Sequence, residues 1–227
     1  MRVLRGRAGV AGVILVVLAI GAIILWTRAV HWRPDPATFP IQGLHVSAAQ
    51  GEIAWNTVAA HEADFAYIRA TDGATRDPRF AINWKGAAEA GLRRGAIHSW
   101  SFCTPARVQA NAFVTTVPRS RDALPAVLDL DFSEECATRP DRAQAIAGIE
   151  TFLRIAETHT GEPMLLKISK AVAKAYQPAR SFARPIWSAR LFFAPDYAAR
   201  PWRVWQASDI RRIDGVDGPV AWDVVAP

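Results

Sequence analysis

The residues with the clearest chemical potential are Asp129 and Asp131, which interrupt the apolar run 125–132. Apolar runs of this length are typical of strands buried on both faces, as in parallel sheets. Because residues i and i+2 of a strand point to one side, both carboxylates should share a face at the strand's end. Repulsion and burial raise a carboxyl pKa, so one of them could protonate a glycosidic oxygen near neutral pH. The alternative is a structural pair that caps a helix or binds arginine.

This strand is part of a predicted alternation of strands and helices. Strands are expected at 41–46, 64–69, 95–101, 125–132, 163–168, 185–193, 202–206 and 220–225. Helices are expected at 53–61, 80–90, 105–117, 143–158 and 171–176. The alternation predicts an α/β fold with a parallel, TIM-like (β/α) barrel, in which reacting groups lie at the carboxyl ends of strands. The closely spaced last three strands predict an irregular, mostly β closure.

Composition bounds the possible partners. With 227 residues, 51% of them apolar, the chain can bury one substantial core. Most of the formal charge of +6 lies in the first forty residues, where five arginines face only Asp35. The rest of the chain has no basic stripe interleaved with aromatic residues, so nucleic acid is not an expected partner.

The N-terminal segment 8–26 contains no charged residue and is long enough to cross a bilayer. Three arginines precede it, so the positive-inside rule places residues 1–7 in the cytoplasm and the remainder outside. We expect a retained signal anchor, because no clear cleavage site follows; a cleaved signal peptide is the alternative. Residues 27–40 contain three prolines and are expected to form an extended linker to a domain at 41–227.

The two cysteines, Cys103 and Cys136, suit this location. In an oxidising compartment a lone pair of cysteines predicts one disulfide, although two unpaired buried thiols would also account for them. The bond would join the segments that follow two neighbouring strands, and it would brace the rim around Asp131.

Several short motifs, taken in order, resemble glycoside hydrolase family 25, the Chalaropsis-type lysozymes. The matching segments are GLHVSAAQG at 43–51, FAYIRATDG at 65–73, DPRFAINW at 77–84, GAIH at 95–98, PAVLDLD at 125–131, WQASD at 205–209 and the segment 215–223. The resemblance extends over roughly residues 41 to 225. It implies the same barrel and cleavage of the β-1,4 bond between N-acetylmuramic acid and N-acetylglucosamine in peptidoglycan.

The resemblance also implies roles for individual residues. Asp131 takes the place of the proton donor and Asp129 that of the assisting carboxylate. The residues expected to contact the glycan are His45, Asp72, His98, Trp100, Trp205 and Gln206. No metal or cofactor is expected, and the partners are peptidoglycan and, through the N-terminal helix, the membrane. This predicts a single-pass protein of a bacterial inner membrane with its domain in the periplasm, or a secreted domain after signal cleavage.

This sequence departs from the family pattern at the acidic positions. The first strand has His45 where the family has aspartate, the proton-donating glutamate is Asp131, and a late aspartate falls on Ala221. Shortening the donor by one methylene withdraws it by about 1.5 Å, and a misplacement of about 1 Å can cost roughly a hundredfold in rate. Three hypotheses remain open: an altered muramidase, a pseudoenzyme that grips glycan without cutting it, and a tethered structural module.

Overall fold

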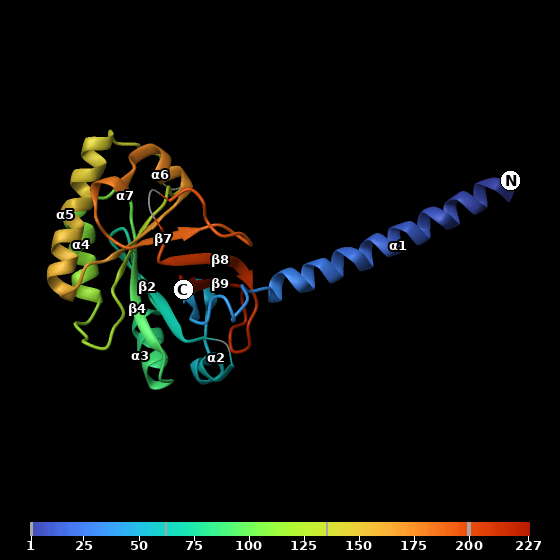
Figure 1. Ribbon diagram of the computed structural model, residues 1–227, viewed down its shortest axis with the longest axis horizontal. Coiled ribbons are helices and arrows are strands. Elements are labelled where there is room, and N and C mark those ends of the chain that lie inside the picture. Colours follow the sequence, from blue (N-terminus) through green and yellow to red (C-terminus); the bar gives the residue numbers. More distant parts are fainter. Residues whose placement is uncertain (1, 62, 135, 199–200) are drawn as a thin grey trace. The chain divides into compact units, whose positions relative to one another are not determined.

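The structure is a computed structural model that describes residues 2–61, 63–134, 136–198 and 201–227. The chain divides into two compact units, residues 1–32 and residues 33–227 (Figure 1). The first unit is a single helix, α1 (Arg2–His31). Its segment Gly12–His31 has a mean hydropathy of 2.5. This segment is long and apolar enough to cross a membrane. The helix continues through residues 27–31, which were expected to be extended, because the first proline after the apolar segment is Pro34.

The second unit is built on one closed sheet. Its strands are β1 (Gln42–Val46), β2 (Phe65–Asp72), β3 (Thr75–Arg76), β4 (Arg93–Ser99), β5 (Val127–Leu130), β6 (Leu165–Ile168), β7 (Ile186–Ala189), β8 (Val204–Arg211) and β9 (Val220–Val225). The sheet order is β1-β9-β8-β7-β6-β5-β4-β2-β3, and β1 also pairs with β2. The sheet therefore closes into an eight-stranded barrel, with β3 as an appendage of β2.

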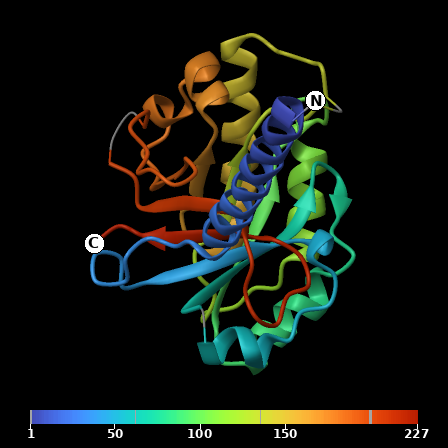
Figure 2. The ribbon, with the colours of Figure 1, turned by 90° about the vertical axis from the view of Figure 1, so that its right-hand side faces the viewer.

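The irregular closure expected from the short spacing of the last strands is an antiparallel one. Around the barrel the pairs β1–β2, β2–β4, β4–β5, β5–β6, β6–β7 and β7–β8 are parallel, whereas β9 runs antiparallel to both β8 and β1. Figure 2 shows the two last strands, in red, beside the first strand, in blue. The expected α/β barrel with a mostly β C-terminal part is confirmed.

Helices cover the parallel part of the barrel. They are α2 (Trp55–His61), α3 (Phe80–Glu89), α4 (Ala106–Thr116), α5 (Arg142–Thr160), α6 (Lys170–Tyr176) and α7 (Pro178–Ser181). The longest, α5, begins where the side chain of Asp141 accepts the Gln144 N–H, and it ends at Gly161 with φ of 82°. α4 and α5 lie side by side against the strands (Figure 1).

Inside the barrel, large apolar side chains fill the half nearest the amino ends of the strands. This core comprises Phe65, Tyr67, Ile97, Val127, Leu165, Trp187 and Val204. Gly95 lies opposite Tyr67 in the register of β4 and β2, and a methyl group there would meet the tyrosine ring. Burial raises the pKa of Tyr67, whose hydroxyl donates to the carbonyl of Pro125. The inward-facing polar residues of these strands therefore lie beyond this core, toward the carboxyl ends of the strands.

Several strand boundaries differ from the prediction, and the largest differences fall in β7 and β8. The strand expected over 185–193 ends at Ala189, because the chain turns through Phe192, whose φ of 65° breaks extended backbone. The strand expected to end at Gln206 continues to Arg211. Its register against β9 shifts twice, between Gln206 and Ser208 and between Ser208 and Arg211, as in a β-bulge.

Candidate active site

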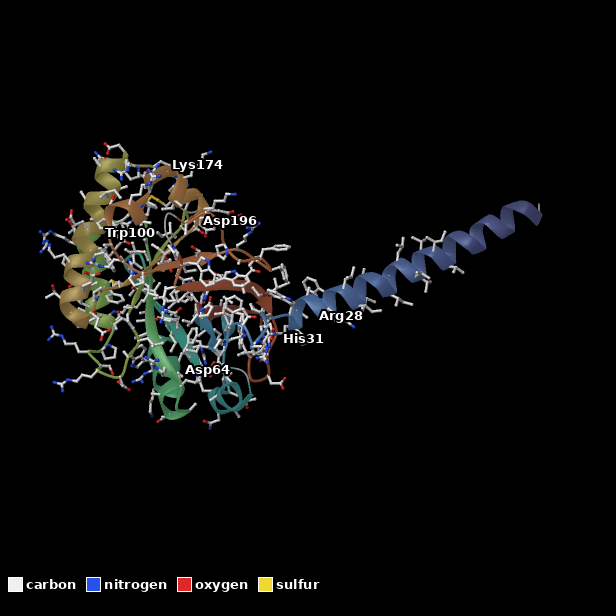
Figure 3. All side chains as sticks on the ribbon, in the orientation of Figure 1. Arg28, His31, Asp64, Trp100, Lys174 and Asp196 are labelled. Atoms are coloured by element: carbon white, nitrogen blue, oxygen red, sulfur yellow. A yellow bond between two sulfur atoms is a disulfide. The ribbon has the colours of Figure 1, made fainter. Side chains whose placement is uncertain are left out.

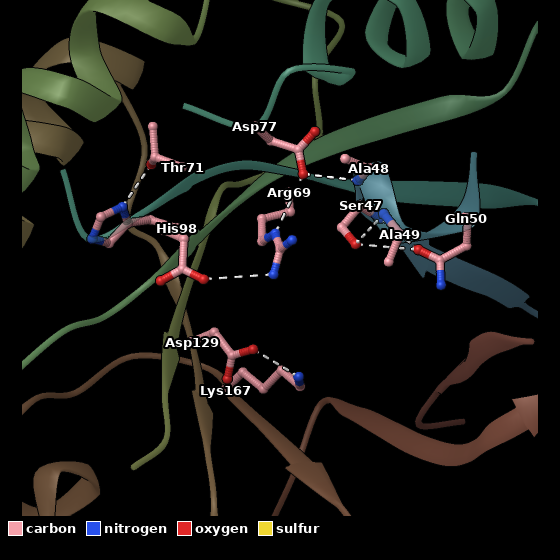
Figure 4. Close-up of polar contacts among 11 residues, drawn as sticks. Ser47, Ala48, Ala49, Gln50, Arg69, Thr71, Asp77, His98, Asp129 and Lys167 are labelled. Carbon is pink, nitrogen blue, oxygen red and sulfur yellow. Dashed lines mark hydrogen bonds and ion pairs between the residues drawn. The ribbon is translucent and has the colours of Figure 1, made fainter. Parts of the chain in front are cut away.

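The inward face of β5 ends on Asp129, which forms an ion pair with Lys167 of β6. The two residues are direct partners in the parallel register, and Lys167 Nζ lies 2.8 Å from Asp129 Oδ2 (Figure 4). The side chain of Asp129 is 20% exposed and that of Lys167 is 13% exposed, so the pair is largely shielded from water. The sequence predicted a cationic partner only in its structural alternative and named arginine for that role.

Asp131 lies just beyond the last residue of β5 and is exposed. Its Oδ1 accepts the N–H of Phe132 at 2.8 Å, which holds the carboxylate at the rim. The negative charges of both Asp129 and Asp131 act on the Lys167 ammonium. The two expected carboxylates therefore form a charged cluster with the ammonium group of Lys167.

The charge of Lys167 is held in place by its surroundings. Burial lowers the pKa of an ammonium, but the carboxylates of Asp129, Asp223 and Asp131 together outweigh this effect and raise the pKa of Lys167. Lys167 therefore remains protonated at neutral pH and serves as a fixed positive charge rather than as a proton donor.

A second polar pair lies across the barrel closure. His45 of β1 and Asp223 of β9 share a hydrogen bond of 2.8 Å between Nδ1 and Oδ2. The Asp223 side chain is wholly buried, whereas that of His45 is 17% exposed. The His45 ring lies edge-on to Trp187, with centroids 5.5 Å apart. His45 therefore stands above the apolar core at the carboxyl end of the barrel.

Arg69 of β2 organises the next side of this end. Its Nε lies 3.4 Å from Asp77 Oδ2, which also accepts the backbone N–H of Ala48 at 2.8 Å (Figure 4). This bond ties Arg69 to the turn 48–50, which the side chain of Ser47 caps. Asp72, expected to contact glycan, lies 3.6 Å from the Arg69 guanidinium and its side chain is 60% exposed.

Two of the expected glycan contacts face away from the barrel interior. His98 is fully buried; its imidazole bonds Thr71 and Gln109 and stacks on Phe152 at 4.3 Å. Burial lowers the pKa of His98 to about 3, so it is neutral. Trp100 is 7% exposed and packs edge-on against Phe152 of α5 (Figure 3). The expectation of direct sugar contacts is corrected for both, because both rings pack against Phe152 of α5.

The two predicted residues of β8 separate in the same way. Trp205 is 4% exposed, donates from Nε1 to the Arg190 carbonyl at 2.8 Å and packs against Phe39, so it is also corrected to a packing residue. Gln206 is half-buried and shares register with Asp223, on the inward face. Of the two predicted β8 residues, Gln206 is therefore the one whose side chain lies on the inward face, toward the carboxyl end of the barrel.

The predicted disulfide between Cys103 and Cys136 is present, with Cα atoms 5.8 Å apart. It links the segments after β4 and β5 next to a cluster formed by the rings of Phe102, Phe132 and Tyr176. The bond and the rings together hold the segment that follows Asp131.

Sequence reasoning missed Lys167 and Asp223, although a signal was present. Each is the one charged residue within a short apolar strand, as Asp129 is within its own. A lone charge on the inward face of such a strand needs a partner, because isolated buried charges are strongly unfavourable. The lone charges of β5, β6 and β9 therefore indicate that partners exist, whereas the register of the strands decides which residues pair.

A cavity of about 600 Å³ opens at the opposite end of the barrel, at the amino ends of the strands. It is lined largely by apolar side chains, including Phe65, Leu165 and Val204, and its carboxylate is Asp64. Its chemistry does not match that of the polar cluster, so we place the candidate site at the carboxyl end. Among the described residues, no group of three or more His, Cys, Asp and Glu side chains is arranged to hold a metal ion.

The sequence model of Glycosyl hydrolases family 25 matches residues 44–216. The chain belongs to this family. Over 197 residues it is 36% identical to the uncharacterized protein YegX of Escherichia coli strain K12. The aligned part covers 83% of this chain and 71% of that protein. It is also 38% identical, over 102 residues, to Lysozyme M1 of Streptomyces globisporus, covering 41% of this chain and 34% of that one.

Solved structures of the family share the fold. A family 25 glycosyl hydrolase from Bacillus anthracis matches with a TM-score of 0.77 and 26% identity over 87% of this chain and 93% of that one. The lysozyme of Streptomyces coelicolor matches with a TM-score of 0.73 and 27% identity over 82% and 92% of the two chains. Family membership supports a function like that of peptidoglycan hydrolases.

Proposed function

We propose that this protein is a muramidase that hydrolyses the β-1,4 bond between N-acetylmuramic acid and N-acetylglucosamine in peptidoglycan. The observation that carries the proposal is the cluster of Asp129, Asp131 and Lys167 at the carboxyl end of a family 25 barrel. The roles are divided by position. Asp131, exposed at the rim, gives a proton to the leaving glycosidic oxygen, and Asp129, fixed by Lys167, supplies negative charge near the anomeric carbon.

The same cluster predicts a modest rate. The Lys167 ammonium offsets part of the negative charge that Asp129 offers to a positively charged transition state. The shorter side chain of Asp131, relative to the family's glutamate, withdraws the donor by about 1.5 Å. Asp72 and Gln206 remain near enough to the barrel end to bind the glycan, and we propose them for that role.

A glycan-binding pseudoenzyme is the second candidate. It is favoured by the replacement of two acidic positions with His45 and Ala221, which are cross-strand partners in β1 and β9. In this case the barrel end would hold peptidoglycan without cleaving it. The two candidates differ in products and not in binding, so one experiment separates them.

The N-terminal helix gives the proposed location. We propose that Gly12–His31 is a retained single-pass anchor in a bacterial inner membrane, with the barrel in the periplasm near its substrate. Membrane fractionation combined with N-terminal sequencing of the mature protein tests this. A soluble protein that starts beyond the apolar segment would show that the helix is a cleaved signal.

Residues 33–227 form a compact unit with its own core, and the solved relatives align with this part of the chain, so the domain can be tested alone. Purified peptidoglycan is incubated with the domain, and the products are identified by mass spectrometry. New reducing-end N-acetylmuramic acid supports the muramidase. Sedimentation of the domain with the same material, without products, would replace it with the pseudoenzyme.

A further inference from the structure

The two family acids lost from β1 and β9 are replaced as a matched pair. His45 and Ala221 are direct partners in the antiparallel register, so a larger residue on one strand faces a smaller one on the other. Two residues further along β9, on the same face as Ala221, Asp223 bonds His45 across the closure. The imidazole therefore stands at a position where the family pattern has a carboxylate, and it has a carboxylate partner on the neighbouring strand.

The partner defines which nitrogen of His45 is available. Asp223 is wholly buried, and its Oδ2 lies 2.8 Å from Nδ1. A carboxylate accepts hydrogen bonds, so Nδ1 is the donor in this contact and Nε2 is the ring nitrogen that Asp223 does not bind. The exposed part of the ring lies away from buried Asp223, which leaves Nε2 toward the carboxyl end of the barrel. The edge contact with Trp187 restrains the ring in this orientation.

The other candidate bases at this end are already engaged. Asp129 is bound to Lys167 at 2.8 Å, and Asp72 lies 3.6 Å from the Arg69 guanidinium. In a single displacement Asp131 still holds its proton while the water adds, so it cannot take one from that water. Arg69 and Lys167 are cations. Among the described residues placed at the barrel end above, His45 is the one imidazole, and a buried carboxylate orients it through Nδ1.

We propose that His45, oriented by Asp223, is a catalytic base that takes a proton from the water that adds to the anomeric carbon. The inference rests on the proposed muramidase activity. Asp131 gives its proton to the leaving glycosidic oxygen as the C–O bond breaks. The water oxygen bonds the anomeric carbon and becomes the new hydroxyl, and its released proton goes to Nε2. Transfer of that proton through solvent to the Asp131 carboxylate restores both groups.

Asp223 is the positioning residue of this pair. With asparagine at 223, the side-chain amide can donate to Nδ1, which places the proton on Nε2 and removes the lone pair from the reacting side. The change leaves His45 itself intact. If Asp223→Asn loses activity but still binds glycan, the loss is due to the changed tautomer of His45 and not to removal of the imidazole ring.

The experiment compares the domain with His45→Ala, alone and with added imidazole, on purified peptidoglycan. The expected result is a loss of roughly a hundred- to ten-thousandfold in His45→Ala and Asp223→Asn, with unchanged sedimentation on peptidoglycan. Free imidazole should restore part of the His45→Ala activity and none of the Asp131→Asn activity. His45→Asp, which returns the family residue, should be more active than His45→Ala.

Each other outcome overturns the inference. Wild-type rates in His45→Ala would exclude a base at this position, and a loss without imidazole rescue would mean that His45 only packs the closure. If alanine unfolds the domain, His45→Gln preserves most of the volume and the comparison with Asp223→Asn still applies. A wild-type domain that yields no products would overturn the proposed function itself, together with this base.

Discussion

Lys167 Nζ and Asp129 Oδ2 lie 2.8 Å apart on neighbouring parallel strands, in direct register and largely out of water. The ion pair gives Asp129 a fixed position at the end of β5. It also links the stability of the barrel end to the charge state of both partners, because removal of one leaves the other poorly solvated.

Lys167→Met should lower the free energy of unfolding by about 1–3 kcal/mol near neutral pH, since it leaves Asp129 without its cation. The double variant Asp129→Asn with Lys167→Met should recover much of the loss. Because the pKa of Lys167 is raised above its ordinary 10.5, the contribution of the pair is intact below pH 10.5 and is lost as pH rises through the raised value. Urea unfolding of the three proteins checks this; equal midpoints would mean that the pair contributes nothing.

Asp131→Asn should abolish muramidase activity, by at least about a hundredfold, because an amide cannot donate the proton that the leaving oxygen needs. Its melting temperature should stay unchanged, since the side chain is exposed. Glu134→Gln, another exposed carboxylate change on the same segment, is the matched control and should retain activity. Full activity of Asp131→Asn would show that another group is the donor.

The domain should lose stability in acid through His98. Its pKa is about 3 in the folded protein and near 6.5 when the chain unfolds, so the unfolded state takes up a proton first. Stability is therefore fully present above pH 6.5 and falls toward pH 3, by about 1.4 kcal/mol per unit at most. Urea midpoints between pH 7 and 4 should fall less steeply for His98→Gln than for wild type, whereas His159→Gln, at a partly exposed site, should follow wild type.

Removal of the disulfide by Cys103→Ser with Cys136→Ser should cost about 4 kcal/mol, from the entropy of the unfolded loop that the bond closes over 33 residues. Circular dichroism should show the same secondary structure at low temperature. A reducing agent should bring wild type down to the melting temperature of the double variant and leave the variant unmoved. A wild-type domain insensitive to reductant would contradict this account.

Gly95→Ala should destabilise the barrel by about 1–3 kcal/mol, because the added methyl group meets the buried ring of Tyr67. Gly218→Ala is the control, since nothing lies within 4 Å of a methyl group there. The difference between their melting temperatures is the measurement. If both variants melt together, the ring can move aside at little cost.

The barrel was predictable from the sequence because each strand is a short apolar run and helices of regular period lie between them. The position of Asp129 followed from the same pattern. The orientation of His98, Trp100 and Trp205 did not, because a shift of one residue along a strand moves a side chain from the interior of the barrel to the helix side. His98 and Trp205 belong to family-like motifs, yet they and Trp100 are buried outside the barrel interior.

The partners of the site were also beyond the sequence pattern. The pairing of Lys167 with Asp129 requires the register of two strands, and that of His45 with Asp223 requires the closure of the barrel across 178 positions of the chain. Composition records the charges but not which strands become neighbours. The departure of His45 from the family was visible in the sequence, whereas its carboxylate partner was not.

The pairing of β1 with β9 has a consequence for how the domain matures. β1 can pair with β2 as soon as both have been synthesised, but its other edge stays open until residues 220–225 arrive. Contacts so distant in the chain form late in folding. His45 and Asp223 are therefore assembled in the final step. A chain that lacks residues 220–225 cannot carry this pair, so the proposed cleavage of peptidoglycan would begin only after the whole domain has been made and the proposed export is complete.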